Sequence, residues 1–132
     1  MPYVNLKIVK NQITEEQKRA VVKGITDLIV NIMGRDRSLT IITIDELDAS
    51  QWAIGGMLLD TLKKNDAVTF VNIKVSKGTT NPDEINKMMK ATKELMISEL
   101  GNNEEANYFI IDEINPEAWG FDGIPMSVRN RT

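Results

Sequence analysis

Cysteine and histidine are both absent from this 132-residue chain, and only 5% of its residues are aromatic. Without cysteine there is no disulfide and no thiol nucleophile, and without histidine there is no imidazole base. The common zinc ligand sets are built from these two residue types and are excluded with them. A metal would have to be held by carboxylates alone, and no carboxylate set with suitable spacing is present. We therefore expect no metal site.

A strong charge of one sign and a long apolar run are also lacking. The net charge is −3, with acidic and basic residues interspersed, so no field attracts nucleic acid or an anionic membrane. No stretch approaches the roughly 20 apolar residues of a membrane span. The N-terminus does not have the basic-then-apolar layout of a signal peptide. We expect a soluble cytoplasmic protein that binds neither nucleic acid nor membrane.

What the chain does contain is a first strand, residues 2–9, with proline directly behind the initiator methionine. Its side chains alternate between two faces, as in a half-buried strand. Removal of Met1 would give Pro2 a free secondary amine, which is a compact base at the rigid end of a strand. Small residues at position two also arise simply from methionine processing, so Pro2 alone does not establish a catalytic role.

The strand begins a β-α-β unit. Thr14 and Gln17 have the spacing of a capping box, which predicts a helix from Glu15, and Gly34 is a typical left-handed stop. Apolar residues recur at three- and four-residue spacing between these points. A second β-rich run, residues 39–47, follows the helix. This order predicts a right-handed crossover and therefore two parallel strands.

The sequence then repeats itself. Residues 69–123 align without a gap on residues 2–56, at a constant offset of 67. Identical pairs include Val4 and Val71, Asn5 and Asn72, Lys7 and Lys74, Gly34 and Gly101, Asp45 and Asp112, and Trp52 and Trp119. The repeat does not keep the proline, because Thr69 stands opposite Pro2 inside the chain. Only one unit can carry an amine base.

The repeat predicts the organisation of the chain. Residues 1–56 form the first unit, 57–67 a connector, 68–123 a second unit that lacks the proline, and 124–132 a C-terminal tail. Two strands are too few for independent stability. We therefore expect an α+β fold in which the tandem units join into a four-stranded mixed sheet with two helices on one face. The other face is left to pack on further copies, which predicts a homo-oligomer.

Several stretches carry a family resemblance: Pro2-Tyr3-Val4-Asn5, Thr14-Glu15-Glu16-Gln17-Lys18, Ile25-Thr26-Asp27-Leu28 and Trp52-Ala53-Ile54-Gly55-Gly56. They resemble the 4-oxalocrotonate tautomerase group of the tautomerase superfamily, and the whole chain resembles a fused, two-unit member. The resemblance implies a tautomerase-like fold, a trimer of fused chains and an amino-terminal proline as general base. It implies no cofactor and no metal. Its substrates are small anionic unsaturated acids, in which a proton moves between carbon and oxygen.

The resemblance also implies roles for individual residues. Pro2 matches the catalytic proline, and Trp52 matches the aromatic residue that lines the pocket before the Gly-Gly turn. The arginines that hold substrate carboxylates in well-known members are absent. The turn after the first strand offers Asn11 or Gln12, the second strand offers Thr40 or Ile41, and Arg35, Arg37 or Lys7 could reach in from a neighbour. Our candidate substrate-binding residues are Trp52, Gln12 and Arg37.

Other readings of these residues remain open. Arg35 and Arg37 follow the first helix, where cations favour the negative end of its dipole, and Trp52 can equally be a packing anchor. A hydratase or dehalogenase on the same scaffold would need a carboxylate near Pro2. An oligomeric binding protein without catalysis would be indicated if Met1 stayed in place.

Overall fold

The computed structural model describes residues 2–62, 66–101 and 107–129. Met1, part of the predicted connector (63–65) and the end of the predicted tail (130–132) lie outside the described residues. The first half contains β1 (Tyr3–Val9), α1 (Glu15–Met33), β2 (Ile41–Leu47), β3 (Ala53–Ile54), β4 (Met57–Leu58) and α2 (Leu59–Leu62). The second contains β5 (Thr69–Ser76), α3 (Pro82–Leu100), β6 (Tyr108–Ile114), β7 (Gly120–Phe121), β8 (Ile124–Pro125) and α4 (Met126–Arg129). Short 3-10 turns span Arg37–Leu39, Ala49–Gln51 and Pro116–Ala118.

The internal repeat runs further than its identities suggest. Each α-helix and β-strand of the first half recurs in the second at the offset of 67, through the hairpins and on to the short helices α2 and α4. Residues 57–62 of the predicted connector form β4 and α2, and residues 124–129 of the predicted tail form β8 and α4. Two-residue strands carry no periodic signal, so the sequence shows only the glycine turns between them.

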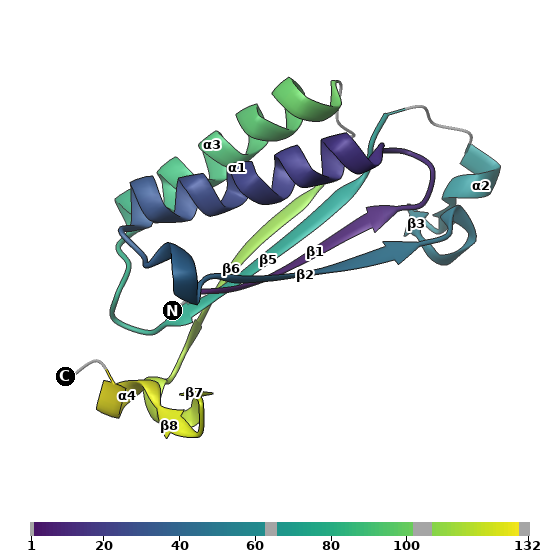
Figure 1. Ribbon diagram of the computed structural model, residues 1–132. Helices are drawn as coiled ribbons and strands as arrows, with labels where there is room; N and C mark the ends of the chain where they lie inside the picture. Colours follow the sequence, from purple (N-terminus) through teal and green to yellow (C-terminus); the bar gives the residue numbers. More distant parts are fainter. Residues whose placement is uncertain (1, 63–65, 102–106, 130–132) are drawn as a thin grey trace.

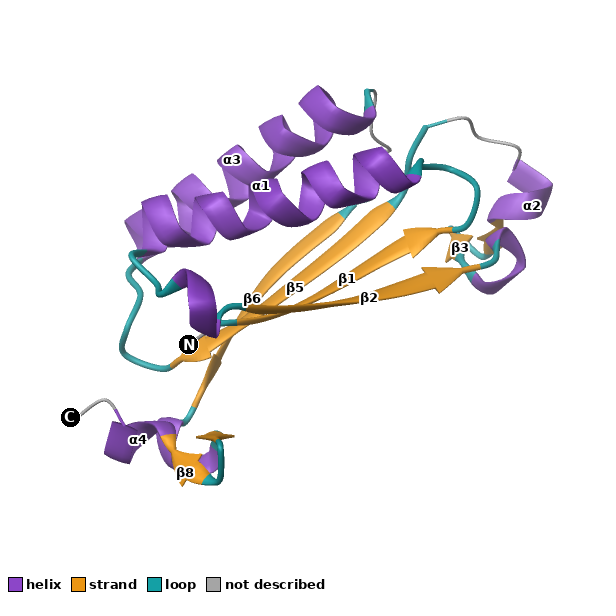
Figure 2. Ribbon diagram, in the orientation of Figure 1, coloured by secondary structure: helices purple, strands orange, loops and turns teal. Residues whose placement is uncertain are grey.

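The four long strands form one sheet in the order β2-β1-β5-β6. β1 is parallel to β2, β5 is parallel to β6, and the two pairs join antiparallel through β1 and β5. Helices α1 and α3 lie side by side on one face of this sheet (Figure 1, Figure 2). The predicted α+β architecture, with a mixed sheet and two helices on one face, is confirmed.

The core lies between the sheet and the two helices. It is formed by one face of the central strands and by the inward side chains of the helices: Val4, Leu6, Ile8, Val71, Ile73, Val75, Ile25, Ile29, Met88 and Met96. Side chains cap the starts of both long helices, and at α1 the capping box predicted from Thr14 and Gln17 is present. Thr14 Oγ1 accepts from Gln17 N at 3.1 Å, Gln17 Oε1 accepts from Thr14 N at 2.9 Å, and Asn81 caps α3.

The pairing register of β1 with β5 shows at which end of the sheet Pro2 and Thr69 each lie. Tyr3 pairs with Lys74, and Ile8 pairs with Thr69. Pro2 therefore lies beside the carboxyl end of β5, whereas Thr69 lies beside the carboxyl end of β1. The hairpin that follows β6 is found at the same end of the sheet as the N-terminus (Figure 1).

Close packing of α1 on α3 at Gly24 gives a stability prediction. A Cβ atom at Gly24 would lie 2.5 Å from Leu95 Cδ1, so Leu95 would have to move. We expect Gly24→Ala to lower the unfolding free energy by about 1 kcal/mol, because overpacking outweighs the gain in helix propensity. In a Leu95→Ala background the same change should raise it by up to about 1 kcal/mol. Urea unfolding at one protein concentration tests this, and an equal effect in both backgrounds would contradict it.

Candidate active site

Pro2 is held at the start of a central strand. Its carbonyl oxygen accepts a hydrogen bond from Ile41 N at 3.3 Å, which ties it to β2, and β5 lies on its other side. The residue is buried and belongs to the strand face that packs under the helices, with Val4 and Leu6. The Pro2 position is therefore held between β2 and β5 and is covered on one face by the helices.

The cavity that contains Trp52 lies at the other end of the sheet. It has a volume of about 510 Å³ and is found between the first hairpin and the starts of β5 and β6. Its lining includes Lys7, Gln51, Trp52, Thr69, Phe70 and Tyr108. The residue at the strand start in this cavity is therefore Thr69, which has no free amine, and not Pro2.

Gln12 also belongs to the Thr69 end. Its side-chain oxygen Oε1 accepts a hydrogen bond from Val68 N at 2.9 Å, directly before β5. The seven residues of β1, roughly 20 Å of strand, separate this end from Pro2. Within one chain, the structure does not bring Pro2 together with Trp52 or with Gln12.

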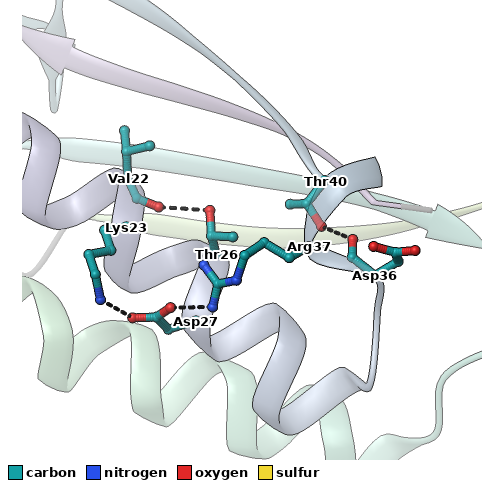
Figure 3. A network of polar contacts seen from close by, with 7 residues as sticks. All are labelled: Val22, Lys23, Thr26, Asp27, Asp36, Arg37 and Thr40. Atoms are coloured by element: carbon teal, nitrogen blue, oxygen red, sulfur yellow. Dashed lines mark hydrogen bonds and ion pairs between the residues drawn. The ribbon is translucent and has the colours of Figure 1, made fainter.

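Arg37 lies at the same end of the sheet as Pro2, but its guanidinium forms an ion pair with a side chain of helix α1. Its Nη2 atom contacts Asp27 Oδ1, while Lys23 Nζ lies 2.9 Å from Asp27 Oδ2 (Figure 3). Lys23 and then Arg37 hold the pKa of Asp27 below its usual range, against a smaller desolvation effect. The guanidinium therefore closes a surface ion-pair network on the outer side of the helix.

This contact predicts that Arg37→Ala leaves turnover unchanged. The pKa of Asp27 should rise toward its ordinary value, because one of its two cationic partners is lost. A depressed carboxylate pKa stabilises the fold above the ordinary value, and this contribution disappears as the pH falls through the depressed one. NMR titration of Asp27 measures the shift, and a large loss of turnover in Arg37→Ala would contradict the placement.

The hairpin and strand residues that surround Thr69 have counterparts in the other unit, at the end of the sheet where Pro2 lies. At the offset of 67, five residues that line the cavity have counterparts at the Pro2 end. Thr69, Trp52, Ile54, Lys7 and Phe70 correspond to Pro2, Trp119, Phe121, Lys74 and Tyr3, in that order. The two hairpins are built alike: Leu59 N donates to Trp52 O at 2.9 Å, and Met126 N donates to Trp119 O at 2.7 Å. Leu59 and Met126 are both buried. By this correspondence, Trp119, Phe121 and Lys74 are the candidate site residues at the Pro2 end.

Lys74 is the cation beside Pro2 in this arrangement. It pairs with Tyr3 across β1 and β5, one residue from Pro2. Its Nζ lies 2.9 Å from Asp112 Oδ2, and Asn72 Nδ2 donates to the same oxygen at 2.9 Å. Lys74, followed by Asn72, keeps the pKa of Asp112 below its usual range. Sequence reasoning missed Lys74, although the Lys7–Lys74 identity was the signal that could have found it.

Arg35 holds the turn at the same end of the sheet. Its Nη2 donates to both the carbonyl oxygen and Oγ1 of Thr79, at 2.7 Å each. Burial lowers the pKa of Arg35, and the nearby Glu84 opposes that shift. Thr79 is the counterpart of Gln12 at the offset of 67. The turn after β1 contains Gln12, whereas the corresponding turn after β5 contains Thr79, which the Arg35 guanidinium holds in place.

Across residues 2–62, 66–101 and 107–129, no group of three acidic side chains is placed to hold a metal ion. No helix within these ranges is long and apolar enough to cross a membrane.

Comparisons with known proteins agree with the duplicated architecture. The family model described as Tautomerase enzyme matches residues 2–62 and again residues 70–129. A probable tautomerase K2 of Dickeya dadantii is 41% identical over 56 residues, which is 42% of this chain and 84% of the relative. A 2-hydroxymuconate tautomerase of Bacillus subtilis is 29% identical over 63 residues, 48% of this chain and all of the relative.

A solved structure described as a fused 4-OT wild type symmetric trimer has the same fold. It superposes with a TM-score of 0.83 at 18% identity, covering 98% of this chain and 99% of the other. Single-unit relatives thus match half of the chain, and a two-unit structure matches nearly all of it. The chain belongs to the tautomerase enzyme family, with one family unit in each half.

Proposed function

We propose that this protein is a cofactor-independent tautomerase of the 4-oxalocrotonate tautomerase type, in which the free amine of Pro2 is the general base. The observation that carries the proposal is the position of Pro2 at the fixed end of a central strand, directly before Tyr3, which pairs with Lys74, and at the same end of the sheet as the second hairpin (Figure 1). Its substrates are small unsaturated 2-oxo and 2-hydroxy acids. The 2-hydroxymuconate tautomerase among the relatives supports this substrate class.

The reaction needs one proton to move between oxygen and carbon. The lone pair of neutral Pro2 takes the hydroxyl proton of a 2-hydroxy enol, and the resulting ammonium returns it to a carbon of the conjugated system. A base that works near neutral pH needs a substantial neutral fraction. Walls formed by Trp119 and Phe121 disfavour the charged amine by desolvation, and the Lys74 cation acts in the same direction.

Thr40 is our candidate for orienting this amine. In the second unit Thr69 N donates to Asn107 Oδ1 at 2.6 Å, and the offset puts Thr40 in the place of Asn107. Thr40 Oγ1 already donates to Asp36 O at 2.9 Å, so it can only accept from the amine (Figure 3). Accepting the N–H of Pro2 leaves the lone pair for the substrate.

The role of Thr40 predicts a rate effect without a binding effect. We expect Thr40→Val to lower kcat by about 2- to 10-fold, the value of one hydrogen bond, with KM unchanged. Thr40→Ser should restore kcat, because it keeps the hydroxyl. Steady-state kinetics of both variants measures this, and a KM increase at unchanged kcat would instead indicate a contact with substrate.

The sheet face that the helices do not cover supports a trimeric assembly. Ile41, Tyr108 and Ile110 lie on this face and are exposed in the single chain. The similar solved structure is a fused trimer. A trimer of this chain would contain three Pro2 sites. Light scattering on the eluting protein tests this, and a monomeric mass would contradict it.

A specific residue favours a second candidate, hydration of an unsaturated acid. Asp122 occupies the place of Gly55, which lines the Thr69 cavity, so the offset assigns a carboxylate to the corresponding turn of the second hairpin. Such a carboxylate can activate water while a protonated Pro2 acts as acid. Halide release from 3-chloroacrylate that is lost in Asp122→Asn would favour this reaction. Unchanged enol ketonisation in Asp122→Asn, without halide release, favours the tautomerase.

The decisive test begins with the intact mass of the purified protein. A mass without Met1, together with rapid ketonisation of 2-hydroxymuconate or enol-phenylpyruvate, supports the proposal. Retention of Met1 together with no turnover on these enols contradicts it and indicates the non-catalytic binding protein. Absorbance at the enol band follows the reaction.

A further inference from the structure

The cavity at Thr69 has no amine at its strand start, but it has the size of a ligand site. It has a volume of about 510 Å³, within the usual range for small-molecule sites. Aromatic and aliphatic side chains supply most of its walls: Leu47, Trp52, Ile54, Phe70 and Tyr108. A decayed site would be expected to fill with side chains, because empty apolar space is unfavourable. The first hairpin instead leaves this space open beside the proline-free unit.

The polar groups of this cavity are predominantly hydrogen-bond donors. Lys7 contributes an ammonium group that bonds Asp45 Oδ2 at 2.9 Å, which uses one of its three donors. The Tyr108 hydroxyl and the Trp52 indole nitrogen have no hydrogen-bond partner in the described part of the chain. Tyr108 is 67% exposed in the single chain and belongs to the sheet face that the proposed trimer would cover. The cavity therefore combines flat apolar walls with one cation and unused donors.

Comparison with the Pro2 end shows that this set is particular to the Thr69 cavity. Tyr108 replaces Ile41, Gln51 replaces Ala118, and Gly55 replaces the carboxylate of Asp122. Each change adds a donor or removes a negative charge. These three differences favour an anion at the Thr69 cavity, whereas the Pro2 end has Arg129 stacked on Phe121 where the first unit has Leu62.

We propose that the Thr69 cavity is a second, non-catalytic binding site for a small flat monocarboxylate, with its carboxylate on Lys7 and its apolar body between Trp52, Phe70 and Tyr108. Thr69 N already donates to Asn107 and lies within an amide bond, so it cannot exchange a proton with the occupant. An occupant of this cavity would be bound and released without being turned over. This inference does not depend on the proposed function.

Phenylacetate is a suitable probe, because it is flat, singly charged and cannot be tautomerised in the same way as an enol. The titration uses a full-length Trp119→Phe protein with one serine inserted between Met1 and Pro2, so that Trp52 is the sole tryptophan and Pro2 has no free amine. Saturable quenching of Trp52 fluorescence supports the proposal. No saturable change would overturn it, whether or not the wild-type protein is a tautomerase.

Two variants and one ligand analogue measure how much the Lys7 ammonium, the Tyr108 hydroxyl and the charge of the ligand each contribute to binding. Lys7→Met should raise Kd about tenfold or more, as expected for a charge-assisted hydrogen bond, whereas Lys74→Met should leave the Trp52 titration unchanged. Tyr108→Phe, which removes only the hydroxyl, should weaken binding by about 2- to 5-fold. Phenylacetamide, which lacks the charge, should bind about tenfold more weakly. Equal Kd values for the wild-type and Lys7→Met proteins would overturn the assignment of the carboxylate.

Discussion

Insertion of one serine between Met1 and Pro2 is expected to lower kcat/KM for enol ketonisation by about 10²- to 10⁴-fold, the usual contribution of a general base. The insertion places the Pro2 nitrogen in an amide bond and leaves β1, with its pairing to β2 and β5, intact. Pro2→Ala should lose less, because alanine still offers a primary amine at the same strand end. Steady-state kinetics on mass-verified proteins measures both effects.

The internal repeat provides a matched control for this result. Thr69→Ala changes the corresponding position of the second unit, where the backbone nitrogen is already part of an amide. We expect kcat/KM to stay within about twofold of the wild-type value, because this position supplies no base. Wild-type turnover by the serine-extended protein, with unchanged secondary structure by circular dichroism, would rule out Pro2 as the base.

The fold could be predicted because its determinants are local or repeated. The capping box at Thr14, the alternation in residues 2–9 and the offset of 67 each report on residues that are close in sequence or identical between units. A single β-α-β unit cannot cover its own sheet, so duplication leaves few arrangements. The short hairpin strands carry too few residues for such a signal, and the predicted unit boundaries consequently stopped at their glycine turns.

The composition of the candidate site could not be predicted as easily, because it depends on which unit meets which end of the sheet. Trp52 follows Pro2 within one unit, and the resemblance therefore grouped them. The antiparallel pairing of β1 with β5 instead puts Trp52 beside Thr69 and Trp119 on the side of Pro2. The charge of Arg37 makes it a candidate from the sequence, and the structure adds a partner, Asp27, ten residues earlier on the preceding helix. Such pairings follow from three-dimensional geometry.

Lys74→Met is expected to lower kcat/KM by about 10- to 100-fold, as the loss of a charged hydrogen bond to the substrate carboxylate implies. The acidic limb of the pH–rate profile should also move to higher pH. A nearby cation lowers the pKa of an amine, so its removal raises the pKa of Pro2 and leaves less neutral base at a given pH. Lys74→Arg keeps the charge and should keep both the rate and the profile close to wild type.

Lys7→Met is the matched control, because Lys7 has the same partners in the other unit: it bonds Asp45 at 2.9 Å as Lys74 bonds Asp112. Both substitutions release one carboxylate from a lysine, so each should raise the pKa of that carboxylate and weaken the fold above its ordinary pKa to a similar extent. Only Lys74→Met should affect turnover, since only Lys74 lies beside Pro2. Equal losses of activity in the two variants would indicate a structural effect, and normal turnover in Lys74→Met would remove this lysine from the site.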